Sequence, residues 1–224
     1  MMEDTQGSES FDIFVSHSHK DYEKVNLYLE YVNDKKTGLG KIFPVFIAHK
    51  DITPTKPWEE EIIKALKHTK IFIAYLTPNF KKSEWCGQES GIAYANDQFI
   101  IPLMDGSKPY GFLGKYQGMP IPSNHRHSRS ETPTTTGLKE FAVSIIKSAY
   151  DDKRCSSMVR NKIFGHLNDI SSFSQTDLVF SLLEHFKPFT EEEKTTILKA
   201  YEGNKQINQA GSADSLIMEL KQNE

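Results

Sequence analysis

The chain has 224 residues, with 27 basic and 30 acidic side chains and a formal net charge of −3. This near-neutral balance excludes the strongly basic domain that is typical of nucleic-acid binding. Two cysteines, Cys86 and Cys155, are too few for a disulfide framework or a Cys-rich zinc site, and they favour a reducing compartment. The acidic N-terminus is unlike a secretion signal, and no apolar run approaches the roughly 20 residues that span a bilayer. We therefore expect a soluble, cytoplasmic protein with no membrane or nucleic-acid partner.

Short apolar runs mark four strands in the first half of the chain, at residues 11–16, 44–48, 71–77 and 99–104. They show little alternation, which is typical of strands buried on both faces. Helical spacing occupies the stretches between them, at residues 25–32, at residues 58–66 and in a third helix that begins at Ser83. Strands that alternate with helices predict βαβ units, and hence an α/β fold with a parallel sheet.

The second half of the chain has a different pattern. Residues 105–136 are rich in turn-forming residues, and a helix is expected near residues 138–150. From residue 151 onward the pattern predicts only amphipathic helices, near residues 158–170, 175–186, 191–201 and 214–221, with a capping box of Thr190 and Glu193. We therefore predict a disordered N-terminus over residues 1–10, one domain over residues 11–150 and a small all-α module over residues 151–224.

The C-terminal module is short for an independent domain. At about 74 residues, it is near the size at which a core of its own is marginal. Its apolar stripes must be buried against one another or against the preceding domain, so we expect it to dock there or on a partner. Two roles are open at this point: the module regulates the domain, or it is a passive brace.

The most informative single residue is Glu89. It follows Trp85 by four residues and precedes Ile92 and Ala93 by three and four, so it projects from the apolar stripe of its helix. A buried carboxylate without partners is costly, and sequences usually avoid one. The alternative is a helix rotated enough to bring Glu89 to solvent or into a salt bridge. Two glycines on the same helix, Gly87 and Gly91, suggest that something approaches its backbone closely.

Other candidate residues follow the predicted strands. Ligands bind at the carboxyl ends of parallel strands, where Ser16, His17 and Ser18 follow the first strand and His49, Lys50 and Asp51 the second. Ordinary capping and turn chemistry is the alternative explanation for these residues. Trp58 and Trp85 fit core anchors better than stacking platforms, and Cys86 fits a buried apolar group better than a nucleophile. No dinucleotide-binding, P-loop, serine-hydrolase or zinc-protease motif is present, and we assign no metal ligands.

Taken together, these residues resemble the TIR (Toll/interleukin-1 receptor) domain family. FDIFVSHSHKD at residues 11–21 looks like the family's first box, and HKDITP at residues 49–54 resembles its second. SEWCGQES at residues 83–90 contains the WxxxE pattern of enzymatically active members, from Trp85 to Glu89. One departure is Thr55, which stands where many members have glycine after the proline of the second box. The resemblance covers residues 11 to about 104 well, and residues 151–224 lie outside it.

The resemblance implies a flavodoxin-like fold, with helices on both faces of the sheet, and cleavage of NAD⁺ at the nicotinamide–ribose bond. It makes Glu89 the catalytic residue and Ser16, His17, Asp51, Trp58 and Trp85 candidate substrate-binding residues. NAD⁺ is then the substrate and no cofactor is needed. Members usually act as TIR–TIR oligomers, in which the second-box loop, residues 51–57 here, reshapes the pocket between subunits.

The biological role that the resemblance implies is less narrowly defined. The layout looks like prokaryotic TIR proteins of anti-phage defence, including the Thoeris type, whose cyclic ADP-ribose signal is sensed by a downstream effector. The product is either ADP-ribose or a cyclic isomer. Two alternatives stay open: a non-enzymatic TIR scaffold that binds other TIR domains, and a bacterial effector that mimics host TIR adaptors.

Overall fold

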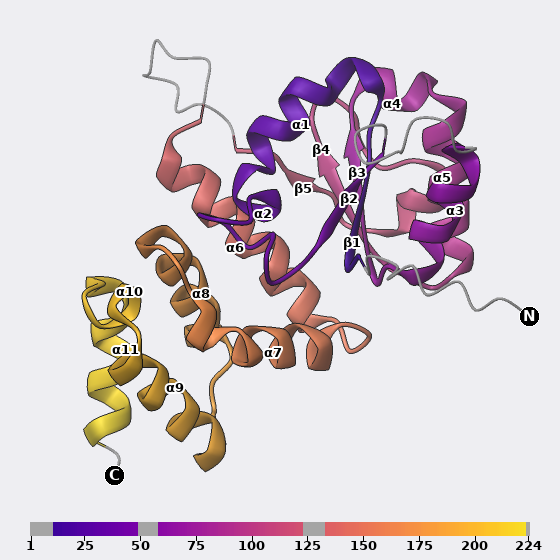
Figure 1. Cartoon of the computed structure of the whole chain (residues 1–224). Coiled ribbons are helices and arrows are strands. Elements are labelled where there is room, and N and C mark those ends of the chain that lie inside the picture. The colour runs from indigo at the N-terminus through magenta and orange to yellow at the C-terminus, as the bar shows by residue number, and fades with distance from the viewer. Residues whose placement is uncertain (1–10, 49–57, 123–132, 223–224) are drawn as a thin grey trace, which may run out of the picture.

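The computed structural model of the chain describes residues 11–48, 58–122 and 133–222 (Figure 1). The predicted disordered N-terminus, Asp51 and the rest of the second-box loop therefore lie outside the described residues. Trp58 is placed in a helix, but its side chain is not described.

A five-stranded sheet forms the centre of the N-terminal part. Its strands are β1 (Ile13–Ser16), β2 (Val45–Ile47), β3 (Ile71–Leu76), β4 (Phe99–Met104) and β5 (Met119–Pro120). They are all parallel and lie in the order β2-β1-β3-β4-β5. This is the flavodoxin-like order, in which the direction of strand progression reverses between β1 and β3. The α/β fold class and the four strands expected from the apolar runs are confirmed.

Helices cover both faces of the sheet. On one side lie α1 (Tyr22–Tyr28), α2 (Glu30–Asn33) and α6 (Thr135–Asp151), and on the other α3 (Trp58–His68), α4 (Pro78–Lys82) and α5 (Glu84–Ala95) (Figure 1). The region also holds two short 3-10 helices, η1 (His19–Asp21) and η2 (Gly111–Lys115). The helix expected over residues 25–32 is broken between α1 and α2. Ser18 precedes η1, but its side chain makes no capping hydrogen bond.

The strand period of two divides the buried side chains into two clusters. Odd-numbered positions such as Ile13, Val15 and Ile73 face α1, α2 and α6. Even-numbered positions such as Phe14 and Phe72 face α3, α4 and α5. Ser16 continues the even-numbered series of β1, so its side chain points toward α5.

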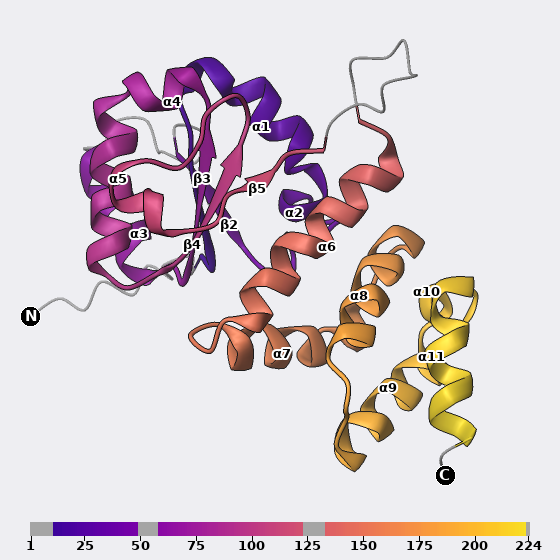
Figure 2. The same cartoon turned by 180° about the vertical axis from the view of Figure 1, so that it is seen from behind.

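The C-terminal helices follow α6 and pack on the side of it that faces away from the sheet (Figure 2). They are α7 (Ser156–Gly165), η3 (Leu167–Asp169), α8 (Phe173–His185), α9 (Glu191–Gly203), α10 (Lys205–Asn208) and α11 (Gly211–Gln222). The predicted capping box of Thr190 and Glu193 opens α9. None of the helices in the described ranges is both long and apolar enough to cross a membrane.

These helices dock on the sheet-bearing part through apolar and polar contacts. One continuous buried cluster runs from β3 through α6 into α8 and α11, and includes Ile73, Ile145, Leu182 and Leu216. Lys162 of α7 forms an ion pair with Asp12, next to β1, at 2.7 Å. Gln175 of α8 donates from Nε2 to the carbonyl of Gly38 at 3.0 Å. The helix α6 is therefore shared by two layers, with one side against the sheet and another against α8.

Deletion of residues 155–224 tests whether the sheet-bearing part of the chain needs the C-terminal helices that cover α6. We expect the truncated chain to aggregate, because it exposes the side of α6 that α8 covers and leaves Asp12 without Lys162. Size-exclusion chromatography and near-UV circular dichroism of the two chains measure the effect. A truncated chain that stays soluble and monodisperse with the spectrum of a packed domain would contradict this expectation and the passive-brace role.

Candidate functional site

Glu89 lies in the middle of α5 and faces the sheet. The helix begins after Ser83, whose hydroxyl accepts a hydrogen bond from the backbone N–H of Cys86. Cys86, Glu89, Ser90 and Ala93 are its buried residues, at the spacing of one helical face. Glu89 is only 2% exposed. The alternative in which Glu89 reaches solvent is therefore wrong.

Ser16 is the hydrogen-bond partner of Glu89. It is the last residue of β1, is fully buried, and its hydroxyl donates to Oε2 of Glu89. The other carboxylate oxygen, Oε1, is buried and has no hydrogen-bond partner among the described residues. None of the ion pairs found in the described ranges involves Glu89, so the salt-bridge alternative is not supported either.

Burial changes the acidity of Glu89. Removal from water disfavours the carboxylate and raises the pKa of Glu89 to about 7, while the hydrogen bond from Ser16 opposes this rise. The side chain is therefore poised between its acid and carboxylate forms at neutral pH. A buried carboxyl group with such a pKa and one unpartnered oxygen is typical of a functional site.

The position of this pair in the sheet agrees with where ligands bind in this architecture. Open α/β sheets bind ligands outside the carboxyl ends of the strands, at the point where the strand order reverses. Ser16 ends β1, and it pairs in register with Ala74 of β3. The Ser16–Glu89 contact therefore lies at the switch point between β1 and β3.

A second buried polar cluster lies at the same edge of the sheet. Asp21, in η1 after β1, accepts hydrogen bonds from Thr77 Oγ1 at 2.5 Å and Asn79 Nδ2 at 2.8 Å, and both donors follow β3. Thr77 also caps α4. The cluster fixes the segment after β1 to the segment after β3, and so holds the edge at which Ser16 and Glu89 meet. Asp21 belongs to the first box but has no predicted role, because its partners Thr77 and Asn79 lie in a distant segment of the chain.

The remaining predicted site residues fall in different places. Trp85 lies one turn before Glu89 on α5 and is half-buried. His17 is fully buried, with its ring 6.0 Å from that of Tyr22 between centroids. Cys86 is buried as expected, and burial raises the pKa of its thiol to about 11, so it is an unreactive thiol at neutral pH.

The close approach expected at the two glycines of α5 is not found among the described residues. A Cβ atom added at Gly87 or Gly91 would have no described atom within 4 Å, so this side of the helix is open toward the part of the chain that the structure describes. Further along the same helix, Tyr94 stacks on Phe112 of η2 with ring centroids 4.7 Å apart. Both rings are exposed, Phe112 by 62%. The open side of α5 therefore has an aromatic end, where the ammonium of Lys115 lies 4.2 Å from the centre of the Tyr94 ring.

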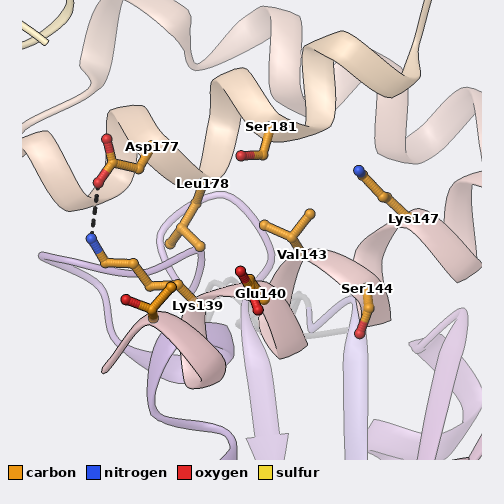
Figure 3. Close-up of a pocket in the computed structure, with 9 residues that line it drawn as sticks. Lys139, Glu140, Val143, Ser144, Lys147, Asp177, Leu178 and Ser181 are labelled. Atoms are coloured by element: carbon orange, nitrogen blue, oxygen red, sulfur yellow. Dashed lines mark hydrogen bonds and ion pairs between the residues drawn. The ribbon is translucent and has the colours of Figure 1, made fainter. Parts of the chain in front are cut away.

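A groove of about 460 Å³ lies between α6 and α8, on the side of the sheet opposite α5. Figure 3 shows Val143 and Leu178 between the two helices and Lys139 joined to Asp177, at 2.9 Å. Its polar groups come from the two helices that pack there, and we assign it to the docking of α8 on α6. Within the described ranges, no cluster of three or more His, Cys, Asp or Glu side chains is arranged to hold a metal ion.

A family model described as TIR domain matches residues 13–128, just over half of the chain. Among solved structures, the chain is similar to the TIR domain of the Toll-related receptor TRR-2 from Hydra magnipapillata. The identity is 21%, the match covers 49% of this chain and 83% of that one, and the TM-score is 0.42. No curated protein sequence gives a significant match.

The burial of Glu89 predicts how stability depends on pH. Because the folded chain holds the pKa of Glu89 near 7, above the value of 4.5 for a free side chain, folding favours the protonated form. The stability that the protonated Glu89 contributes to the folded chain is complete below pH 4.5 and is lost as the pH rises to 7. Glu89→Gln removes this titration. Between pH 4.5 and pH 8, the free energy of unfolding of the wild type should therefore fall by about 3 kcal/mol relative to that of Glu89→Gln.

Urea denaturation at both pH values measures this difference. Glu84→Gln, an exposed position on the same helix, is the matched control and should follow the wild type at each pH. A Glu89→Gln protein whose difference from the wild type is the same at both pH values would show that Glu89 is not a buried titrating group.

Proposed function

The chain belongs to the TIR domain family, and we propose that it cleaves NAD⁺ between nicotinamide and ribose, with Glu89 as the catalytic residue. The observation that carries this proposal is the state of Glu89: a buried carboxyl group with one oxygen held by Ser16 and the other without a partner. TIR domains include both NAD⁺-cleaving enzymes and scaffolds. A scaffold has no need of a buried carboxyl group that is kept near its ionisation point.

The chemistry fits a single carboxylate. The bond between the ribose carbon and the nicotinamide nitrogen breaks with its electron pair on the nitrogen, so nicotinamide leaves as a neutral molecule and needs no acid. The ribosyl carbon becomes an oxocarbenium-like cation, as in glycoside hydrolysis. A carboxylate of Glu89 in a site with little water would stabilise that cation. Attack by water, with loss of a proton, then gives ADP-ribose, and attack by a nucleophile of the same molecule gives a cyclic isomer.

Several residues have proposed roles around this step. Trp85, one turn from Glu89 on α5, would hold the cationic nicotinamide ring against its aromatic face. Asp51 and Trp58 stay candidate substrate-binding residues that lie outside the described side chains. His17 is fully buried in this state, so a contact with substrate would require the segment after β1 to move.

Access to Glu89 links catalysis to assembly. A side chain that is 2% exposed cannot contact a nucleotide until the groups that cover it move. Self-association, which is common among TIR domains, would supply that movement. The open side of α5 beyond Gly87 and Gly91, with exposed Tyr94 and Phe112 at its end, is the surface that we propose for it.

We place this reaction in the cytoplasm and in bacterial anti-phage signalling, with a nucleotide product that a separate effector senses. The two cysteines are both free and buried, which agrees with a reducing compartment. The scaffold is the competing function, and the same exposed aromatic pair favours it. Nicotinamide release from NAD⁺ separates the two, because a scaffold releases none.

The first prediction concerns Glu89→Gln. The substitution keeps the size and polarity of the side chain but removes the charge that stabilises the ribosyl cation. Nicotinamide release should fall by about a hundred- to thousandfold, the usual effect of losing one charge-stabilising contact. Chromatography of nicotinamide measures the rate, with Glu84→Gln as the matched control that keeps full activity. A folded Glu89→Gln protein with substantial turnover would remove Glu89 from the catalytic role.

The second prediction concerns concentration. If association uncovers Glu89, the rate per molecule should rise as the protein is concentrated or crowded. Nicotinamide release over a dilution series, with light scattering on the same samples, measures both quantities. A rate per molecule that stays constant while the scattering reports only monomer would show that self-association is not needed.

A further inference from the structure

We propose that Ser16 is the positioning residue for Glu89: its hydroxyl holds Oε2, so that Oε1 is the oxygen presented to the ribosyl group of the substrate. This inference rests on the proposed function and goes further, because it assigns different tasks to the two carboxylate oxygens. It also gives Ser16 a task different from direct substrate binding.

Rigid elements fix both ends of the contact. Ser16 ends β1, whose four residues are all buried and which lies between β2 and β3 in the sheet. Glu89 is fixed to α5, which packs on the same face of the sheet through Cys86 and Ala93. Sites built on strands and helices hold their groups more accurately than sites on loops. The hydroxyl of Ser16 therefore restrains the carboxylate in one orientation.

The two oxygens of Glu89 differ in what they can still bind. Oε2 accepts the hydrogen bond from Ser16, and Oε1 has no partner among the described residues. A buried acceptor without a partner is costly to the folded chain, which makes Oε1 an unsatisfied site for a ligand. A ribose hydroxyl that donates a hydrogen bond, or the electron-poor ribosyl carbon, would satisfy it.

Ser16 also controls how readily Glu89 ionises. Burial and the Ser16 hydrogen bond are the two causes that act on the pKa of Glu89, and they act in opposite directions. The titratable group that interacts with Glu89 is the Cys86 thiol of α5, which stays neutral below its pKa of about 11. Asp21 of η1 and Tyr110 lie near that thiol. Loss of the hydroxyl should therefore raise the pKa of Glu89 above 7.

The test compares three variants of the full chain. Ser16→Ala removes the hydroxyl, and Ser16→Thr keeps it. Ser90→Ala is the matched control, because Ser90 is a buried serine of α5 whose hydroxyl donates to the carbonyl of Cys86 at 2.6 Å and not to Glu89. Thermal unfolding of each variant establishes that it is folded.

Carbon-13 NMR of labelled glutamate carboxyl groups is the first readout, and it needs no activity. The Glu89 signal is the one that disappears in Glu89→Gln. In Ser16→Ala its titration midpoint should move up by about one pH unit, the usual effect of one hydrogen bond to a charged group. Ser90→Ala should leave the midpoint unchanged, and Ser16→Thr should restore it.

The pH profile of nicotinamide release is the second readout. In Ser16→Ala the acid limb should move up by the same amount, and kcat should fall while KM stays close to the wild-type value. A wild type without NAD⁺ cleavage would reject the proposed function, yet the NMR midpoint would still test the Ser16–Glu89 contact. An unchanged midpoint in folded Ser16→Ala, or a kcat equal to that of the wild type on the alkaline plateau, would overturn the positioning role.

Discussion

A single hydrogen bond from the end of a central strand to the middle of a helix holds the buried carboxyl group at this edge of the protein. It joins Ser16 of β1 to Glu89 of α5, two residues that are 73 positions apart in the chain. The packing of α5 on the sheet buries this carboxyl group, and the bond holds it at the point where the strand order reverses. Because no cation neutralises the carboxyl group within the described ranges, burial alone raises its pKa to about 7 and one oxygen stays unpartnered. The proposed chemistry depends on that state.

The two faces of the sheet pack against different parts of the chain. The face with even-numbered strand residues packs α3, α4 and α5, and it holds Glu89. The opposite face packs α6, and beyond α6 the C-terminal helices. The Lys162–Asp12 ion pair reaches the amino end of β1, whereas Ser16 stands at its carboxyl end. A second contact reaches the end of α5 itself, because Arg154, in the turn before α7, forms an ion pair at 3.0 Å with Asp97, which follows α5. An influence of the C-terminal helices on Glu89 therefore has two routes, through β1 or through the end of α5.

Much of this architecture follows from local sequence pattern. Unbroken apolar runs located four strands, and the spacing of Trp85, Ile92 and Ala93 placed Glu89 on a helical face directed inward. β5 was missed because it has only two residues, one of them proline. The Ser16–Glu89 and Asp21–Thr77 contacts join distant segments, so no local pattern reveals them. No described atom approaches the glycines of α5, and spacing cannot show whether the neighbour of a helix surface belongs to the same chain.

Cleavage of NAD⁺ by the purified full-length protein is the central claim, and product stoichiometry tests it most directly. The protein is incubated with NAD⁺ over a range of concentrations, and mass spectrometry follows every nucleotide and nicotinamide. The account predicts that nicotinamide appears in equal amounts with ADP-ribose or an isomer of cyclic ADP-ribose, as NAD⁺ disappears. NAD⁺ that stays intact under conditions in which light scattering shows the protein to be associated would contradict it and favour a scaffold.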